Sequence, residues 1–264
     1  MDTQLLTEKF ERLGARLKVE PAAIKDRVSI NIRADHKGEF FNIRVKHGEQ
    51  LRLDAIDVQP RQRHLLLLAA PQAGRVDSSA KQEFLCGHDE RAWFVAAVPE
   101  SRGASNVRTA MEALKPGSVI ASQNAHRVRF EDRNRRRNAG FVRQGEWFFV
   151  PARLVSVNPA HVLRNEPLQR TGGKPHWAEF ACRSGGELVY FSPSRNVALR
   201  EWQYKQRSRK GPDDWRMVRR NGQMMVSGRI SHPDHKTITL RGWHWVVMNT
   251  EHESEAMRFV SFLD

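Results

Sequence analysis

Two short stretches of the chain carry cysteine and histidine at spacings that suit metal binding. Cys86 and His88 are two positions apart, and His232 and His235 frame the run HPDH. One thiolate and three imidazoles are the number and type of ligands that tetrahedral zinc takes. The sequence predicts no cofactor firmly. If the two distant stretches meet, Cys86, His88, His232 and His235 form a candidate zinc site. If they do not meet, Cys86 is a small core residue and the histidines are ordinary turn residues.

The same histidines also suit acid–base catalysis. Imidazole titrates near neutral pH, so two histidines can deprotonate a ribose 2′-hydroxyl and protonate the leaving oxygen. This chemistry indicates a ribonuclease or phosphodiesterase, with or without a metal. The P-loop, nucleophile-elbow, dinucleotide-binding and HExxH patterns are absent from the sequence, so an enzyme stands as the alternative to a binding protein. The candidate catalytic residues are His88, His232 and His235, and the further acid–base groups are Asp89, Glu90, His176, Glu179 and Asp234.

Positive charge is concentrated in two runs of the sequence. Lys and Arg number 44 against 30 Asp and Glu, which gives a formal net charge of +14. Seven arginines lie between positions 127 and 143, and seven more lie between 195 and 220. Guanidinium groups hold phosphate oxygens bidentately and stack on bases. We therefore expect a nucleic-acid-binding protein, with RNA favoured over DNA.

Aromatic residues are interleaved with cations in the second basic run. Single-stranded nucleic acid needs a stacking surface beside a track of positive charge, and this run offers both. The alternative is that these aromatic residues anchor a basic loop to the core. The predicted nucleic-acid-binding residues are Arg127, Arg129, Arg133, Arg135, Arg136, Arg137, Trp202, Tyr204, Arg207, Arg209, Lys210, Trp215, Arg219 and Arg220.

Composition also bears on whether the protein binds other proteins or membranes and on its cellular compartment. A basic surface also suits an acidic protein, so a protein-interaction module is a second alternative. No run approaches the ~20 apolar residues of a membrane span, and the first residues lack the pattern of a signal peptide. Two cysteines are too few for a disulfide scaffold. We expect no membrane partner and a cytoplasmic protein.

Alternation of apolar and polar residues predicts the elements that must position these groups. A helical pattern over 3–17 precedes period-two stretches at 28–34, 39–45, 51–59 and 64–70, which are typical of an antiparallel meander. The stretch HLLLLAA at 64–70 is apolar at consecutive positions, so we expect both of its faces to be covered. Two strands, or one bulged strand, are expected around Gly87.

The second half of the chain reads in the same way. We expect a helix at 105–114 with Ser105 as its N-cap, a strand from Trp147 to Val157 and a long connection over 158–175. After the connection we expect a hairpin of 176–182 with 187–192, helical structure within 194–209, and three strands between 215 and 249. The predicted fold class is α+β, predominantly antiparallel β in a barrel or sandwich with a few short helices. The predicted division is a β-rich N-terminal half, 1–157, and a β-rich C-terminal half, 176–264, although one single domain is also compatible.

Overall fold

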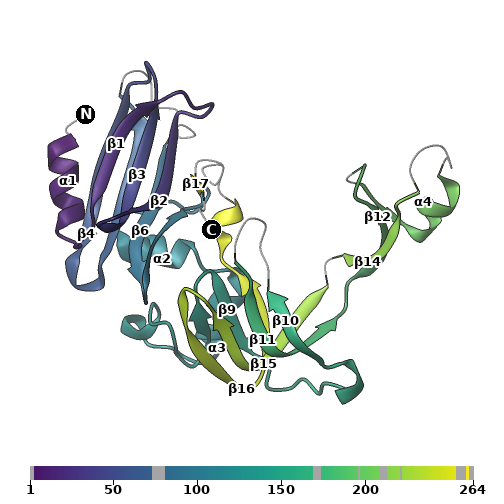
Figure 1. Ribbon diagram of the computed structural model, residues 1–264. Coiled ribbons are helices and arrows are strands. Elements are labelled where there is room, and N and C mark those ends of the chain that lie inside the picture. The colour runs from purple at the N-terminus through teal and green to yellow at the C-terminus, as the bar shows by residue number, and fades with distance from the viewer. Residues whose placement is uncertain are drawn as a thin grey trace.

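The computed structural model describes residues 3–72, 81–168, 174–195, 197–207, 213–220, 222–253 and 260–261. Its strands form four sheets that are mostly antiparallel and packed in sandwich fashion, without a closed barrel among the described residues (Figure 1). The predicted α+β class, dominated by antiparallel β structure, is confirmed. No helix in the described part of the chain is long and apolar enough to cross a membrane.

The N-terminal part is a sandwich of two four-stranded sheets. Phe10, Phe41, Leu65 and Phe84 are fully buried in the core of this sandwich. The predicted strands of this part are confirmed, but β1 pairs with β3 and β17 pairs with β2 in parallel. One sheet has the order β1(Leu17–Ala22), β3(Gly38–Lys46), β2(Val28–Asp35), β17(Val260–Ser261), and the other β4(Leu51–Gln59), β5(His64–Pro71), β6(Gln82–Asp89), β7(Ala92–Ala97).

The helix α1, Thr3–Glu11, is shorter than predicted, and Leu17 already belongs to a strand. Gly14 has a φ of +77°, a left-handed conformation that ends a helix and that other residues rarely adopt. The helix therefore stops at Gly14, before the end of the helical pattern predicted over 3–17.

Strand β5 is covered on both faces, as predicted. Leu65 and Leu67 face the sandwich core, whereas Leu66 packs with the helix α2, Val107–Ala113. The N-cap of α2 is Asn106, one residue later than predicted. Its side chain accepts a hydrogen bond from the Thr109 N–H at 2.9 Å, and its own N–H donates to Thr109 Oγ1 at 3.1 Å. This reciprocal pair satisfies backbone donors that the first helical turn leaves open.

A six-stranded central sheet joins distant parts of the chain. Phe149 faces one core with Ala178 and Ile230, while Phe148 on the other face packs with the helix α3, Gly117–Ala125, which was not predicted. Strand β10 lies within the predicted connection, and β9 pairs with β16 across it. The division into two domains stays a prediction. The strand order is β10(Leu163–Leu168), β11(His176–Ser184), β15(Gln223–His232), β16(His235–Met248), β9(Trp147–Pro151), β8(Val142–Gln144).

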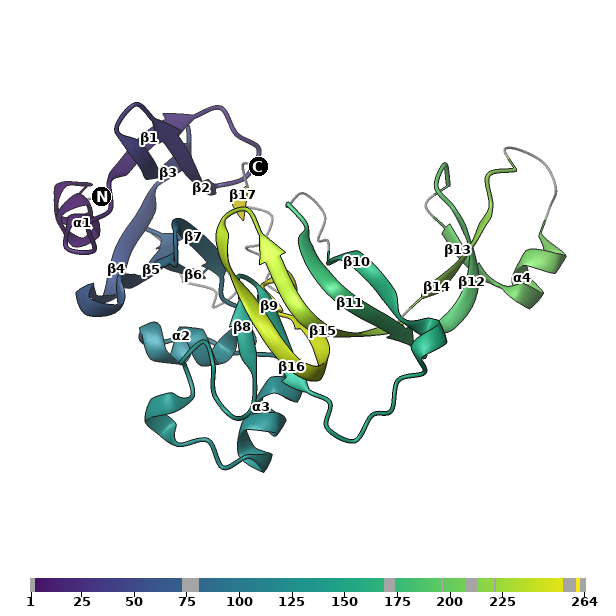
Figure 2. The ribbon, with the colours of Figure 1, turned by 60° about the horizontal axis from the view of Figure 1, so that its bottom comes forward.

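A small three-stranded sheet projects from the body of the molecule (Figures 1 and 2). We call this sheet and its helix the arm; it comprises β13(Val197–Arg200), β12(Glu187–Ser192), β14(Arg216–Arg220) and α4(Glu201–Gln206). The predicted hairpin of 176–182 with 187–192 is wrong, because β11 pairs with β10 and β15 while β12 pairs with β13 and β14. Gly185 and Gly186, both with positive φ, lie between the two sheets.

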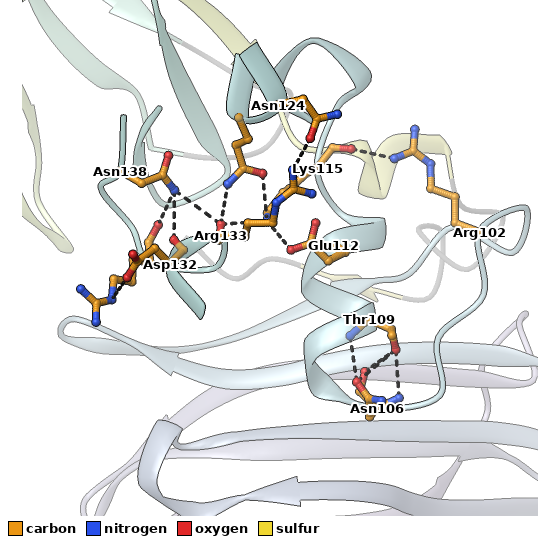
Figure 3. Close-up of polar contacts among 11 residues, drawn as sticks. Arg102, Asn106, Thr109, Glu112, Lys115, Asn124, Asp132, Arg133 and Asn138 are labelled. Carbon is orange, nitrogen blue, oxygen red and sulfur yellow. Dashed lines mark hydrogen bonds and ion pairs between the residues drawn. The ribbon is translucent and has the colours of Figure 1, made fainter. Parts of the chain in front are cut away.

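The arginine-rich segment 127–143 is fastened to α2 and α3 through one buried lysine (Figure 3). Lys115 is 2% exposed, and its Nζ donates to Glu112 Oε1 at 2.6 Å and to the Arg133 carbonyl at 2.8 Å. Gln123 Nε2 donates to the same carbonyl at 2.8 Å, and Asn138 Nδ2 donates to the Asp132 carbonyl at 3.2 Å. These bonds fix the segment's backbone and so determine where its side chains reach.

Candidate metal centre

Three histidines meet where β11, β15 and β16 lie side by side. His232 is the last residue of β15 and His235 the first of β16, and the turn between them places these two residues opposite each other. His176 begins β11, whose next residue pairs with Ser231 of β15. The possible ligand atoms of the three histidines all lie within 4.8 Å of one another. Strand pairing therefore brings His176 to the HPDH run from a position far away in the sequence.

Two of the imidazoles point at a glycine. The ring centroids of His176 and His235 are 5.3 Å apart, and their planes differ by 24°. A Cβ built on Gly145, in the β8–β9 turn, would lie 2.8 Å from His235 Nε2 and 3.4 Å from His176 Nε2. Gly145 has a φ of +56° and leaves open the space towards which both nitrogens face.

Buried polar atoms without a partner gather at this point. Twelve buried side-chain nitrogen and oxygen atoms in the described residues lack a hydrogen-bond partner, and five of them belong to His176, His235, Gln144 and Trp147. Gln144 precedes Gly145, and the Trp147 ring is 6.4 Å from that of His176. Buried polar groups are nearly always paired, so these atoms could still bind an ion, a water molecule or a ligand.

His232 holds a different position from the other two histidines. Its Nδ1 accepts a hydrogen bond from the Asp234 N–H at 3.1 Å, so Nε2 carries the proton and donates to the Lys174 carbonyl at 3.3 Å. Zinc–nitrogen bonds of 2.0–2.1 Å in a tetrahedron place ligand nitrogens about 3.3 Å apart. Ligation therefore requires His232 to release one of these bonds and the three rings to draw closer together.

The Glu90 carboxylate, which pairs with Arg136, lies next to the outer nitrogen of His235. Glu90 Oε2 is 3.8 Å from His235 Nδ1 and accepts the Lys236 N–H at 2.5 Å. Arg136 forms ion pairs with both Asp89 and Glu90. A carboxylate next to the outer nitrogen of a ligating histidine fixes its ring and tautomer and makes it a better ligand. Glu90 also has a φ of +53°, so its backbone is held in a conformation that costs energy.

The electrostatic surroundings keep two of the imidazoles neutral. Burial, together with the neighbouring histidines, lowers the pKa of His176 to about 3. Burial also lowers the pKa of His235 to about 4. A metal ligand must be a neutral imidazole, whereas a general acid must be protonated. At neutral pH His176 and His235 are therefore available as metal ligands and do not act as general acids.

The centre opens onto a cavity of about 540 Å³ between the N-terminal sandwich and the central sheet. His232, His235 and Gly145 line one end of it, together with Lys174. Apolar residues from β7, α2 and β9, including Trp93 and Phe148, line it further on, together with charged residues such as Arg33, Glu39 and Arg143. Ligand sites combine apolar surface with convergent polar groups, and this cavity offers both.

The predicted zinc ligands are brought together only in part. His232 and His235 meet, but Cys86 is fully buried in the sandwich core, where burial raises the pKa of its thiol. His88 packs against Trp93, with ring centroids 4.9 Å apart, and is not part of the group of three. The third imidazole is His176, which the sequence offered only as one of several acid–base residues. No spacing rule links it to His232, because the link is the register of β11 with β15.

Most predicted phosphate-binding arginines of the segment 127–143 have partners within the chain. Nucleic-acid binding by these residues stays a prediction. Arg127 has a φ of +49°, Arg129 and Arg135 pair with Asp132, Arg133 donates to Asn124, Arg136 pairs with Asp89 and Glu90, and Arg137 donates to the Thr239 carbonyl.

The predicted residues of the second basic run lie on the arm. Trp202 is 57% exposed, whereas Tyr204 stacks on Tyr190 and contacts Trp215 edge to face. Arg209 and Lys210 lie outside the described residues, as do the side chains of Arg219 and Arg220.

Comparison with protein-family models, curated proteins and solved structures finds no match, so the functional conclusion depends on the geometry of the site itself.

Proposed function

We propose that the protein is a metal-dependent hydrolase of phosphodiester bonds in nucleic acid, with a zinc-class ion held by His176, His232 and His235. The observation that carries this proposal is the meeting of three imidazoles, of which two direct their Nε2 atoms into the space at Gly145. Structural zinc sites have four protein ligands, while catalytic sites have three and keep one position open. Here the cavity provides the open side.

The charge of the chain supports the substrate class. A net charge of +14 favours polyanions, and RNA remains favoured over DNA as in the sequence-based prediction. A bound zinc-class ion lowers the pKa of a coordinated water and stabilises developing charge on phosphoryl oxygens. The chain itself contributes Glu90, whose carboxylate lies 3.8 Å from His235 Nδ1, and the cation of Lys174, which pairs with Asp234 at the cavity.

Cleavage of labelled RNA and DNA, with and without EDTA, tests the proposal. We expect the wild-type protein to shorten the strands, EDTA to stop this, and added Zn²⁺ to restore it. His235→Ala should remove activity, whereas His161→Ala, at an exposed position on the turn Pro159–His161, should not. Bis(p-nitrophenyl) phosphate serves as a small substrate that reports the centre alone.

Each contrary outcome has a distinct meaning. Cleavage that persists in EDTA would refute the metal and favour acid–base chemistry by histidine. A strand that is bound but stays intact with metal-loaded protein would refute the hydrolase and leave a nucleic-acid-binding protein. Binding of an acidic protein but of no nucleic acid would favour the interaction module.

A further inference from the structure

The arm exposes more large apolar side chains than its size accounts for. Ten large hydrophobic residues are exposed among the described residues, and four of them belong to the arm: Leu188, Val197, Trp202 and Met217. Met217 is 64% exposed and Trp202 57%. Isolated exposed apolar residues are ordinary, but a group of them on one projecting element marks an interaction surface.

Strand register places the three strand residues of this group on one face. Met217 pairs with Tyr190, and Val197 pairs with Ser192. Leu188, Tyr190 and Ser192 alternate along β12 and so point to the same side of the sheet. Side chains of directly paired residues also share a face. Leu188, Met217 and Val197 therefore lie on the face that α4 partly covers.

The aromatic residues of this face have two different roles. The Tyr204 ring lies 3.8 Å from that of Tyr190, nearly parallel to it, and the Arg207 guanidinium carbon lies 3.6 Å from the Tyr204 centroid. Two groups this close to one ring occupy its opposite faces, so Tyr204 has no face left for a base. Trp215 meets the edge of this stack. Tyr204 and Trp215 thus hold α4 on the sheet, and Trp202 is the indole that remains accessible.

The charge of the arm selects the kind of partner. Positions 187–220 carry nine Lys and Arg residues against four Asp and Glu. Lys205 and Arg200 form ion pairs with Glu201 and Glu187, and these pairs are exposed. Exposed ion pairs contribute little and exchange readily for other anions. Like charge opposes docking of a second copy of the same arm, whereas a polyanion complements it.

We propose that the arm binds single-stranded nucleic acid, with a base stacked on Trp202, neighbouring bases against Leu188 and Met217, and phosphates along the cations. Unpaired bases expose the ring faces that such a surface needs, and duplexes do not. This inference rests on the proposed function only in assigning the bound strand as the substrate of the metal centre.

Binding of fluorescein-labelled oligo(U) to the full chain, measured by anisotropy in EDTA, tests the arm separately from cleavage. Stacking of a base on an aromatic side chain contributes about 1–3 kcal/mol, so Trp202→Ala should weaken binding by about 5- to 150-fold. Trp202→Phe should retain most of the affinity. The matched control is Trp177→Ala, which removes a 44% exposed indole from the central sheet and should leave affinity unchanged.

Several results would overturn the arm's role. These are equal affinity of Trp202→Ala and Trp177→Ala, tighter binding of a duplex than of oligo(U), and displacement of oligo(U) by polyglutamate at equal charge, which would indicate a protein partner. Zinc content and turnover of bis(p-nitrophenyl) phosphate should not change in Trp202→Ala. If both are absent from the wild type while oligo(U) binding still depends on Trp202, the proposed function fails and the arm's role stands.

Discussion

Substitution of Gly145 by alanine probes the space between the imidazoles directly. The added methyl carbon would lie 2.8 Å from His235 Nε2, whereas ordinary contacts begin at 3.4 Å. The His235 nitrogen therefore has to move away from Gly145 by about 0.6 Å, whereas ligation requires it to draw closer to the other two histidines. The methyl group also enters the space in which the ion is expected. We predict that Gly145→Ala lowers zinc affinity at least tenfold, the size of effect known for changes next to metal ligands, about 10- to 100-fold.

Backbone strain has to be separated from this effect. Gly145 has a φ of +56°, and a left-handed conformation costs a non-glycine residue about 1–2 kcal/mol. Gly48 has a φ of +77° with no atom within 4 Å of an added Cβ, so Gly48→Ala carries a comparable backbone cost without touching the centre. Both variants should lower the free energy of unfolding, and only Gly145→Ala should lose zinc affinity.

Competition with a chromophoric zinc chelator measures the affinities, and chemical denaturation measures stability. Wild-type zinc affinity in both variants would show that the two Nε2 atoms do not converge on an ion at Gly145. Loss of zinc from Gly48→Ala as well would assign the effect to general destabilisation.

Three further predictions concern the surroundings of the centre. Glu90→Gln should weaken zinc binding about 10- to 100-fold, because a carboxylate next to a ligating histidine strengthens it; unchanged affinity in a chelator competition would exclude this role. Lys115→Met should lower the free energy of unfolding by about 2 kcal/mol, because the Glu112 carboxylate and the Arg133 carbonyl each lose the hydrogen bond from Lys115 Nζ. Lys205→Met, in an exposed pair, should leave it nearly unchanged, and equal urea midpoints would contradict this. The metal-free protein should lose stability as pH falls from about 6.5 towards 4, because the pKa values of His176 and His235 are lower in the folded than in the unfolded chain, which therefore binds more protons. The loss is at most about 2 kcal/mol per histidine at pH 5. A urea midpoint that stays constant over this pH range would refute the prediction.

The sequence pattern predicted those strands whose formation depends mainly on the alternation of apolar and polar residues within them. The strands of the N-terminal sandwich follow from alternation, and the two covered faces of β5 follow from its continuous apolar run. The predicted hairpin at 176–192 is wrong because its strands pair with residues distant in the sequence, which local patterns do not reveal. Two adjacent period-two stretches look like a hairpin, but β11 and β12 pair with other strands, a choice made by partners distant in sequence.

The candidate centre was predictable only as far as its local motif. His232 and His235 are placed by the turn between them, which the HPDH run shows. His176 joins them through the register of β11 with β15, and Glu90 reaches His235 because the β6–β7 turn approaches β16. Arg136 resembled a free phosphate-binding residue, since its carboxylate partners lie far away in the sequence. These contacts depend on the pairing of strands that are distant in the sequence, and the spacing of residues along the chain does not reveal that pairing.

Metal content of the full chain tests the centre most directly. After saturation with Zn²⁺ and extensive dialysis, elemental analysis should find about one zinc per wild-type chain and none in the variant combining His176→Ala, His232→Ala and His235→Ala, with His161→Ala as the matched control. Co²⁺ in place of Zn²⁺ should give visible absorption bands typical of tetrahedral coordination in the wild type alone. A folded wild-type protein that retains neither ion, or a triple variant that retains zinc equally well, would contradict the assignment of these three histidines as a metal centre.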